Sequence, residues 1–386
     1  MKNPRQATVV GLYVSQLARS LPGRRSHELI IEAVLGALAD AGVDPKTVDG
    51  AAIEWAGPGG VPGEVGSWAP YFRQPLAWTS EHFMDLAGAR GLLKAAAAIE
   101  MGLCDTVVLG GGRAGPWAED GTAVGAAMNL EFADVFGSST MAQFGTVAQR
   151  HMYEFGTTAE QMAAVAATIR NHGHVNPEAA LYGAGPYTVA DILASPIIAS
   201  PFHRLECCLI QEGACAIVLT TAERARDLRQ QPVHVLGGGM EFFRGAYANP
   251  PLYRDMRHLG KDAARRAFAR AGVGARDIDV FNLYDAVSFE VIRQFEMLGL
   301  CAEGEGGAFA ADGRITLGGE CPTNLDGGLL SHAWIGTAQL TLKVIEGVRQ
   351  LRRDCGPRQV ENAELTLVTN AGSGAQHIEL AILGRG

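Results

Sequence analysis

The stretch Asn324-Leu-Asp-Gly-Gly-Leu-Leu-Ser-His-Ala-Trp-Ile-Gly336 carries three glycines in 13 residues and lies between two strongly patterned segments. Gly327 and Gly328 permit backbone torsions that other residues resist, and they let a ligand approach the main chain. Residues 337–352, directly afterwards, have the pattern of a helix. Unpaired N–H groups at the start of a helix attract partial negative charge. The stretch is therefore either a tight strand-to-helix turn, which its spacing alone favours, or a reaction site.

Length and charge set the class of the protein. A chain of 386 residues, of which 47% are hydrophobic and 19% charged, is long enough for two domains or one large fused one. The net charge of −9, without a run of lysine and arginine, argues against nucleic acid or an anionic membrane as a partner. No segment is apolar over a length that spans a bilayer, and the N-terminus lacks the apolar core of a signal peptide. We therefore expect a cytoplasmic protein.

The cysteines point to the same compartment. There are seven of them, an odd number, and none forms a CxxC pair. Cys207 and Cys208 are adjacent and cannot easily bridge each other. This usage fits reduced thiols better than a disulfide framework. We expect no bound metal.

A short internal match indicates that the second half of the chain repeats the first. Ala37-Leu-Ala-Asp-Ala-Gly-Val43, followed after four residues by Val48-Asp49, matches Ala267-Phe-Ala-Arg-Ala-Gly-Val273, followed after four residues by Ile278-Asp279. The two segments stand 230 residues apart, and each joins a predicted helix to a predicted strand. A duplicated β-α-β unit explains both.

The duplication divides the chain into one predicted domain over residues 1–230, with a loop insertion at about 114–212, and a second over 233–386. Periodicity predicts helices and strands that alternate, with helices at 27–41, 87–101, 139–155, 158–171 and 337–352 and strands at 7–18, 48–55, 105–112 and 215–220. Such alternation produces mostly parallel sheets covered by helices. Ligands then bind beyond the carboxyl ends of the strands, which singles out the loops near 80–88, 283–288, 324–336 and 369–374.

Several motifs together resemble the thiolase superfamily. They are the duplicated halves, helix 87–101 with strand 105–112, Leu283-Tyr-Asp-Ala-Val-Ser288, Leu298-Gly-Leu-Cys301 and the Asn324 stretch. The resemblance covers nearly the whole chain, and its nearest branch is typified by sterol carrier protein X and the lipid-transfer thiolases. It implies an α/β thiolase fold with β-α-β-α-β-α-β-β halves and layers in the order α-β-α-β-α. It also implies a coenzyme A thioester as substrate, no bound cofactor, and a homodimer that pairs through strand 105–112 and its neighbours.

The residues that perform Claisen chemistry in the superfamily do not carry over. The nucleophilic cysteine at the start of helix 87–101 corresponds to Asp85, and a second cysteine corresponds to Ala286. The histidine of the family's Gly-His-Pro motif falls at or next to Trp334. Thioester exchange needs a nucleophile that can be both attacked and expelled, and a thiolate suits both steps. A carboxylate would give a mixed anhydride, and an indole cannot take a proton.

One branch of the superfamily dispenses with the cysteine. Its members are thiolase-like aldolases that cleave β-hydroxyacyl-CoA thioesters of steroid side chains to a ketone and a shorter acyl-CoA. This chain resembles them at Leu283-Tyr-Asp285, Leu298-Gly-Leu-Cys301, the Cys207-Cys208 pair and Gly347-Val-Arg-Gln-Leu-Arg352. They act with a small partner protein that has an OB-fold and a zinc ribbon, and their two proposed catalytic groups are tyrosines. One tyrosine matches Tyr284, and the other falls at Trp334, where this chain departs from the pattern.

A retro-aldol step needs a base for the β-hydroxyl, donors for the enolate oxygen and an acid for carbon. Tyr284 is either the proton carrier, although a free phenol ionises only near about pH 10, or a buried tyrosine with a satisfied hydroxyl. Asp85 is either a base or a cap or ion-pair partner at the helix start. His332 is either structural or a replacement for the missing proton carrier. Trp334 either donates to the enolate oxygen or shapes an apolar pocket.

The glycine loops are predicted to bind substrate through Asn324, Gly327, Gly328, Asn370, Gly372 and Gly374. With the four catalytic candidates, they predict an acyl-CoA lyase that acts as a retro-aldolase without a cysteine nucleophile. One alternative is a thiolase-type acyltransferase, such as an acetyl-CoA acetyltransferase, that relies on another thiol such as Cys207, Cys208 or Cys301. The other is a non-catalytic subunit that binds acyl-CoA or scaffolds a partner.

Overall fold

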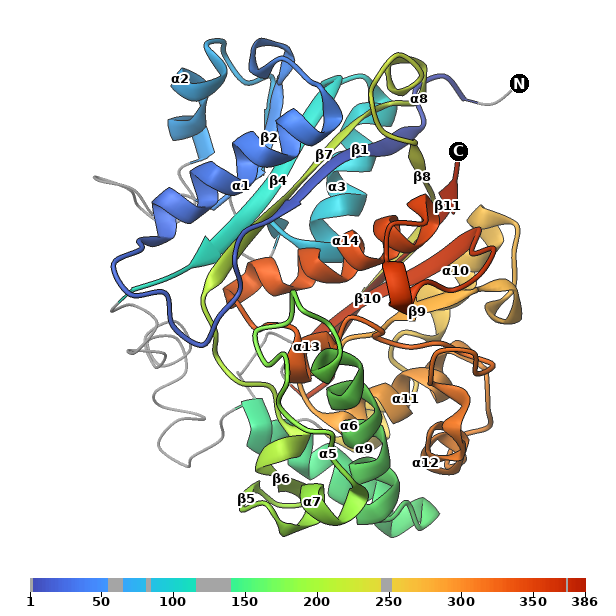
Figure 1. Cartoon of the computed structure of the whole chain (residues 1–386). Helices are drawn as coiled ribbons and strands as arrows, with labels where there is room; N and C mark the ends of the chain where they lie inside the picture. The colour runs from blue at the N-terminus through green and yellow to red at the C-terminus, as the bar shows by residue number, and fades with distance from the viewer. Residues whose placement is uncertain (1–2, 55–64, 81–84, 116–139, 244–251, 373) are drawn as a thin grey trace.

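The computed structural model describes residues 3–54, 65–80, 85–115, 140–243, 252–372 and 374–386 (Figure 1). A mixed sheet of nine strands runs through the molecule in the order β3-β2-β4-β7-β1-β8-β11-β10-β9. The strands are β1 (Ala7–Val14), β2 (Gly50–Ile53), β3 (Trp78–Thr79), β4 (Thr106–Arg113), β7 (Gly213–Thr221), β8 (Val233–Phe242), β9 (Val280–Asn282), β10 (Leu365–Gly372) and β11 (His377–Arg385).

Each half of the chain contributes the same series of strands. In the N-terminal half, β2 is parallel to β4, and β7 pairs antiparallel with both β4 and β1. In the C-terminal half, β9 is parallel to β10, and β11 pairs antiparallel with both β10 and β8. The halves join where β1 pairs antiparallel with β8. Five of the eight strand pairings in the described sheet are antiparallel, so the expectation of a mostly parallel sheet is wrong. The predicted duplication is confirmed, and the predicted division at residues 230–233 falls between α8 (Ala222–Ala225) and β8.

The helices next to the sheet form three layers, of which one contacts both halves of the sheet and the other two cover one half each. Two helices, α3 (Gly88–Met101) and α14 (Gln339–Arg352), pack against each other and contact strands of both halves. On the outside, α1 (Ser26–Ala41) covers the N-terminal strands and α10 (Lys261–Ala271) covers β8 and β11 (Figure 1). Nearly every residue of α14 is buried, as expected of a helix enclosed on all sides. The predicted α-β-α-β-α succession is confirmed.

A pair of equivalent glycines, one in each half, lets the outer helices pack closely on their strands. A Cβ on Gly11 of β1 would lie 2.2 Å from the carbonyl oxygen of Ala37, and a Cβ on Gly237 of β8 would lie 2.4 Å from that of Ala267. Ala37 and Ala267 are equivalent positions of the internal repeat. The repeat therefore encodes the same contact between helix and strand twice.

The turns of the two halves are equivalent as well. Gly42 and Gly272 end α1 and α10 in the left-handed region, with φ of 71° and 72°. Asp49 accepts hydrogen bonds of 2.8–3.0 Å from two backbone N–H groups at the start of β4. Asp279 accepts two of 2.9 Å at the start of β10. The Asp that closes each copy of the sequence match thus fixes where the next strand begins.

A helical layer covers the lower part of the molecule in Figure 1. It contains α5 (Thr140–Phe155), α6 (Ala159–His174), α7 (Val189–Ala194), the ribbon of β5 (Ile197–Ala199) and β6 (Phe202–His203), α9 (Tyr253–Met256), α11 (Ser288–Leu298), α12 (Gly306–Phe309) and α13 (Gly328–Ser331). The helices predicted at 139–155 and 158–171 are confirmed as α5 and α6. The predicted 114–212 insertion thus contains three helices, α5, α6 and α7, and residues 116–139 of it lie outside the described part.

The position of β4 corrects one expectation. Both edges of this strand are occupied, by β2 on one side and β7 on the other. Strand 105–112 therefore cannot itself pair with a second subunit, and β3 is the strand at that end of the sheet.

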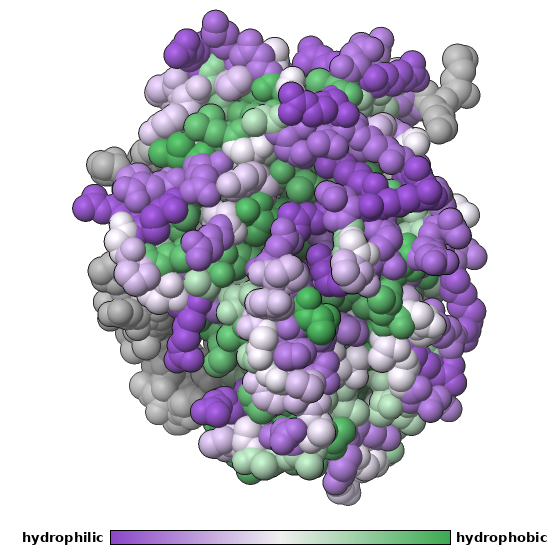
Figure 2. Space-filling view, in the orientation of Figure 1, coloured by the Kyte–Doolittle hydropathy of each residue, from purple (hydrophilic) through white to green (hydrophobic). Residues whose placement is uncertain are grey.

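The surface is mixed in character. Hydrophilic side chains cover much of the face shown in Figure 2, and apolar side chains are visible between them. Within the described ranges, no helix has both the length and the apolar composition that crossing a membrane requires.

We predict that Gly11→Ala and Gly237→Ala each lower the free energy of unfolding by about 1–3 kcal/mol, because the added methyl group must push the outer helix away from its strand. Urea denaturation followed by circular dichroism measures the change. Gly66→Ala is the matched control, since a Cβ there meets no atom within 4 Å. Wild-type stability of both core variants would show that these helices are not held by the close approach.

Candidate active site

The loop after β9 lies at the centre of the predicted site. The Tyr284 N–H donates to Thr369 Oγ1 of β10 (2.9 Å), and Gln294 Nε2 of α11 donates to the Tyr284 carbonyl (2.7 Å). The Thr369 hydroxyl also donates to Gln294. The Tyr284 ring is 5% exposed, and its centroid lies 6.4 Å from that of Phe144. The backbone of Tyr284 is therefore fixed on both sides, at the place where two parallel strands end.

Asp285 connects this loop to the Asn324 stretch and to the central helix α14. Lys343 Nζ donates to its Oδ1 (2.6 Å), and the Leu329 N–H contacts both carboxylate oxygens (2.9 and 3.1 Å). Burial raises the pKa of Asp285, and the Lys343 ammonium opposes that rise without cancelling it. Asp285 thus joins the loop after β9 to the Asn324 stretch and to α14.

The side chain of Asn324 also forms hydrogen bonds with another part of the protein. Its side-chain amide accepts from the Leu283 N–H (2.8 Å) and donates to the Leu283 carbonyl (2.9 Å). Its backbone is in the left-handed region, with φ of 50°. The residue predicted to bind substrate thus fastens its own stretch to the loop that carries Tyr284.

The two glycines of the stretch make room for protein atoms. A Cβ on Gly328 would lie 2.0 Å from Asp285 Oδ2, and a Cβ on Gly327 would lie 2.6 Å from the Cα of Gly173 in α6. In both cases other protein atoms occupy the space that a side chain would need, which gives each glycine a structural reason. The approach of a ligand to the backbone of these glycines stays a prediction. The loops near 283–288 and 324–336, both singled out from the sequence, are in contact.

His332 ends the short helix α13 and is 4% exposed. Its Nδ1 lies 2.8 Å from Asp326 Oδ2, and the other Asp326 oxygen accepts from the Gly328 N–H (2.8 Å). Burial opposes ionisation of Asp326, but His332 and then Lys343 outweigh it and hold the pKa of this carboxyl well below its usual range. His332 Nε2 has no hydrogen-bond partner among the described residues. The pair therefore presents a buried imidazole with one ring nitrogen in use.

Trp334 is half-buried and is held by the segment before β7. The backbone N–H of Trp334 donates to Gln211 Oε1 (2.7 Å), and the backbone carbonyl of Trp334 accepts from the backbone N–H of Gln211 (2.9 Å). The guanidinium carbon of Arg113 lies 5.3 Å from the centre of the indole ring, a distance typical of a cation–π contact. Trp334 is thus a fixed wall rather than a mobile side chain.

Asp85, at the start of α3, is neutralised by two cations. Its carboxylate accepts from Lys94 Nζ and lies 3.9 Å from Arg90 Nη1. Arg90 in turn donates to Glu379 (2.8 Å) and contacts His377 (3.2 Å). From the sequence, Asp85 is expected to be either a base or a cap or ion-pair partner at the start of the helix. The geometry shows the ion pair. Residues 81–84 of the same predicted loop lie outside the described ranges.

The final predicted loop meets the start of α3. In the amide orientation that satisfies both ends of Asn370, its oxygen accepts from the Ala89 N–H (3.0 Å) and its nitrogen donates to the Thr369 carbonyl (2.9 Å). A Cβ on Gly372 would lie 2.5 Å from His377 Nε2. Gly374 forms the β10–β11 turn with φ of 68°. Asn370 therefore joins the loop to α3, whereas Gly372 and Gly374 shape the turn between β10 and β11.

The cysteines are poor nucleophiles. All seven are free. Burial raises the pKa of Cys104, Cys207 and Cys301 to about 12 and that of Cys321 to about 11. Burial also raises the pKa of Cys208, Cys215 and Cys355. Since a thiolate is the reactive species, none of these side chains is prepared for acyl transfer.

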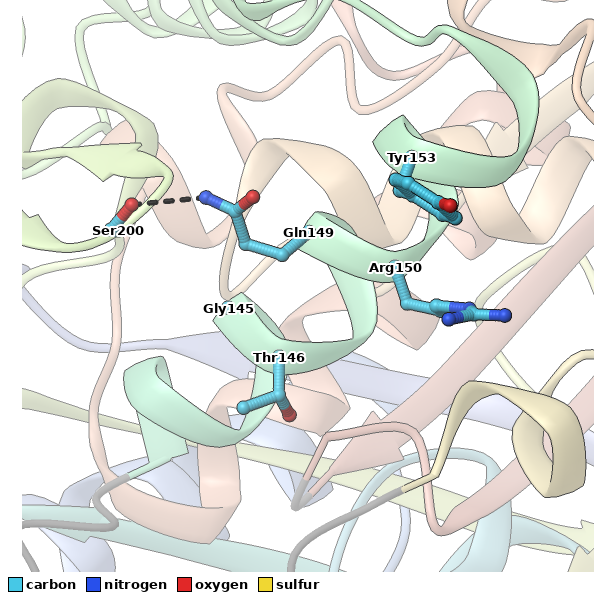
Figure 3. Close-up of a pocket in the computed structure, with 6 residues that line it drawn as sticks. All are labelled: Gly145, Thr146, Gln149, Arg150, Tyr153 and Ser200. Carbon is cyan, nitrogen blue, oxygen red and sulfur yellow. Dashed lines mark hydrogen bonds between the residues drawn. The ribbon is translucent and has the colours of Figure 1, made fainter.

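Two surface depressions lie away from these loops. One, of about 440 Å³, is on the outer face of α5 and is lined by Gly145, Thr146, Gln149, Arg150, Tyr153 and Ser200 (Figure 3). The other, of about 550 Å³, lies beside the C-terminal end of α1, and its lining includes Gly42, Asp49 and Arg224. Neither contains a predicted site residue. Among the described residues, no group of three or more His, Cys, Asp or Glu side chains is arranged to hold a metal ion.

The sequence analysis missed several residues of the site. Lys343, Arg90, Thr369 and Gln211 were not singled out, although each contacts a predicted loop. Lys343 offered a signal, because it stands among apolar residues in Leu340-Thr-Leu-Lys-Val-Ile345. A charge on the buried face of a helix requires a partner of opposite charge.

Comparison with known proteins agrees with this geometry. A family model described as Thiolase C-terminal domain-like matches residues 256–385. The 17-hydroxy-3-oxo-4-pregnene-20-carboxyl-CoA lyase of Mycobacterium tuberculosis is 34% identical over an alignment of 394 residues, which covers 96% of this chain and 97% of the lyase. A solved Ltp2-ChsH2(DUF35) aldolase matches with a TM-score of 0.82 and 30% identity, over 99% of this chain and 98% of that one.

Human mitochondrial 3-ketoacyl-CoA thiolase has the same fold, with a TM-score of 0.70 at 15% identity and coverage of 99% of both chains. The lyase is similar over nearly its whole length, and the family model covers the part of the chain that contains the β9 loop, the Asn324 stretch and the final loop. The chain therefore belongs to the thiolase superfamily.

Proposed function

We propose that this chain is a retro-aldolase that cleaves a β-hydroxyacyl-CoA to a ketone and a shorter acyl-CoA. The observation that carries the proposal is a site without a usable thiol in which Tyr284 is fixed between β10 and α11. Two relatives of at least 30% identity that are similar over nearly the full chain are a CoA lyase and an aldolase. A thiolase-type acyltransferase would need a thiolate, and burial disfavours one at every cysteine.

The reaction breaks the bond between the α- and β-carbons. A base takes the proton of the β-hydroxyl, whose oxygen becomes the ketone oxygen. The electron pair of the broken bond forms the thioester enolate, and a proton delivered to the α-carbon completes the shorter acyl-CoA. The step needs two proton transfers and a donor to the enolate oxygen, and no covalent intermediate with the protein.

Tyr284 and His332 are the two proton carriers of the proposal. Asp326 keeps the His332 ring in one orientation, since the carboxylate contacts Nδ1 and leaves Nε2 for a substrate proton. Tyr284 is attached to the rigid Asp285–Lys343 pair. The carboxylate of Asp85 balances the charge of the cationic side chains of α3. Trp334 forms a wall of the proposed substrate pocket.

We extend the substrate class and the partner from the relatives. The name of the lyase describes a steroid side-chain thioester, so we infer a bulky, polycyclic acyl group here. The name of the aldolase describes a DUF35 subunit, which supports the OB-fold and zinc-ribbon partner expected from the resemblance. We infer a hetero-oligomer built on a homodimer of this chain.

We predict that Tyr284→Phe lowers kcat by at least about 10²-fold while the melting temperature stays close to that of the wild type. Ketone release from a β-hydroxyacyl-CoA, in the presence of a DUF35-type partner, measures the effect. Tyr253→Phe is the matched control, because Tyr253 is also buried but donates to Glu303 (3.0 Å). Full activity of the Tyr284 variant removes this residue from the reaction. A wild-type chain inert with and without the partner favours a non-catalytic subunit.

We predict that His332→Gln also lowers kcat by about 10²-fold, because an amide cannot carry a proton. Asp326→Asn should reduce kcat less, since it removes only the group that orients the ring. Both rates are measured with the ketone assay, and melting temperatures identify variants that do not fold. If folded His332→Gln cleaves at the wild-type rate, the imidazole is structural.

We predict that iodoacetamide near about pH 8 leaves cleavage largely intact, because alkylation requires a thiolate and these thiols are protonated at that pH. Mass spectrometry counts the modified cysteines while activity is followed in the same sample. Loss of activity in step with alkylation of a single cysteine would instead support an acyltransferase that uses that thiol.

A further inference from the structure

Gln211 is a buried residue of the site whose amide is only half used. It is 1% exposed and lies in the segment between the Cys207-Cys208 pair and β7. Its backbone N–H donates to the Trp334 carbonyl (2.9 Å), and its side-chain Oε1 accepts from the Trp334 N–H (2.7 Å). The resemblance places the superfamily's histidine at or next to Trp334. Gln211 thus holds the backbone of a residue at or beside that position.

The orientation of this amide follows from its contact. An N–H group must face the oxygen of the side chain, because the opposite orientation would place two donors against each other. The Nε2 group therefore points away from the Trp334 backbone. It has no hydrogen-bond partner in the part of the chain that the structure describes. A buried donor without an acceptor destabilises the folded protein, so a fold that keeps it must recover the cost elsewhere.

The polar groups around Trp334 show which ligand suits this donor. Glu212 accepts backbone hydrogen bonds from Leu21 (2.5 Å) and Gly115 (3.1 Å). Glu54 accepts from Gly112 (3.0 Å) and from the hydroxyl of Thr337. The two carboxylates are thus committed to the protein, and the Arg113 guanidinium lies over the indole ring of Trp334. A buried N–H donor without an acceptor among the described residues favours an oxygen that carries partial or growing negative charge.

We propose that Gln211 Nε2 donates a hydrogen bond to the thioester carbonyl oxygen of the bound acyl-CoA and to the enolate oxygen formed from it. The proposal rests on the proposed function, which requires such a donor. Trp334 cannot take a proton, so in this chain its role is to place the Gln211 amide and to close the pocket. The hydrogen bond strengthens as the oxygen gains charge, without any covalent change at Gln211.

The experiment compares a thioester with a thioether. Calorimetry measures the binding of an acyl-CoA that lacks the β-hydroxyl and of the S-alkyl-CoA of equal length, which has no carbonyl oxygen. The wild type should bind the thioester roughly tenfold more tightly, as expected for one net hydrogen bond. Gln211→Glu keeps an oxygen for the Trp334 N–H but replaces the donor, so its two affinities should agree within about twofold. Its kcat for cleavage should fall about 10²-fold.

Gln339→Met is the control, because Gln339 follows the same stretch and its buried Oε1 also has no partner among the described residues. It should keep the preference for the thioester. Equal wild-type affinities for both ligands, or an unchanged preference in Gln211→Glu, overturn the proposal. If Gln339→Met loses the preference for the thioester as well, the proposal is also overturned. That result indicates that a water molecule held between the two amides binds the carbonyl oxygen. A preference that depends on Gln211 in a chain that cleaves nothing supports the donor and refutes the retro-aldolase.

Discussion

The buried ion pair between Asp285 and Lys343 is the contact on which the geometry of the site depends. Lys343 belongs to the central helix α14, Asp285 to the loop after β9, and the same carboxylate receives the Leu329 N–H of the Asn324 stretch. Removing one member of a buried ion pair leaves the other charge buried without a partner, which lowers the free energy of unfolding by about 3–5 kcal/mol. Three segments that are distant in sequence therefore share one anion. Tyr284 directly precedes Asp285, and its own backbone is held by Thr369 and Gln294.

This anchoring explains how a thiolase scaffold can do without its thiols. In the N-terminal half, the position of the nucleophile is Asp85, which contacts Lys94 and Arg90. A carboxylate that is occupied by two cationic side chains is a poor acyl carrier. The groups able to move protons, Tyr284 and His332, stand in the C-terminal half. A reaction that breaks a carbon–carbon bond by proton transfer alone can rely on that half, whereas acyl exchange cannot.

Sequence reasoning recovered the fold because its signals are local and occur twice. The Ala37 and Ala267 segments are matched in sequence, and both receive a glycine from the neighbouring strand. It also identified which loops meet, since strands that run in parallel end at one edge. It could not tell which polar groups the protein uses itself. The Asn324 amide bonds to Leu283, 41 residues away, and the interior position of β4 depends on strand order. Neither spacing nor composition carries such information.

Buried polar groups that lack a partner separate structural from functional roles. Most polar groups of this site are satisfied internally, as the amide of Asn324 and the carboxylates of Asp285 and Asp326 show. Folding alone accounts for them. A donor or acceptor left unpaired in the interior lowers stability, and folding gives no reason to retain it. Among the described residues, Gln211 Nε2 and His332 Nε2 are in this situation. Under the proposed function, a ligand oxygen and a transferable proton supply their missing partners, so these two nitrogens, rather than the glycine backbone, are the proposed contacts to the substrate.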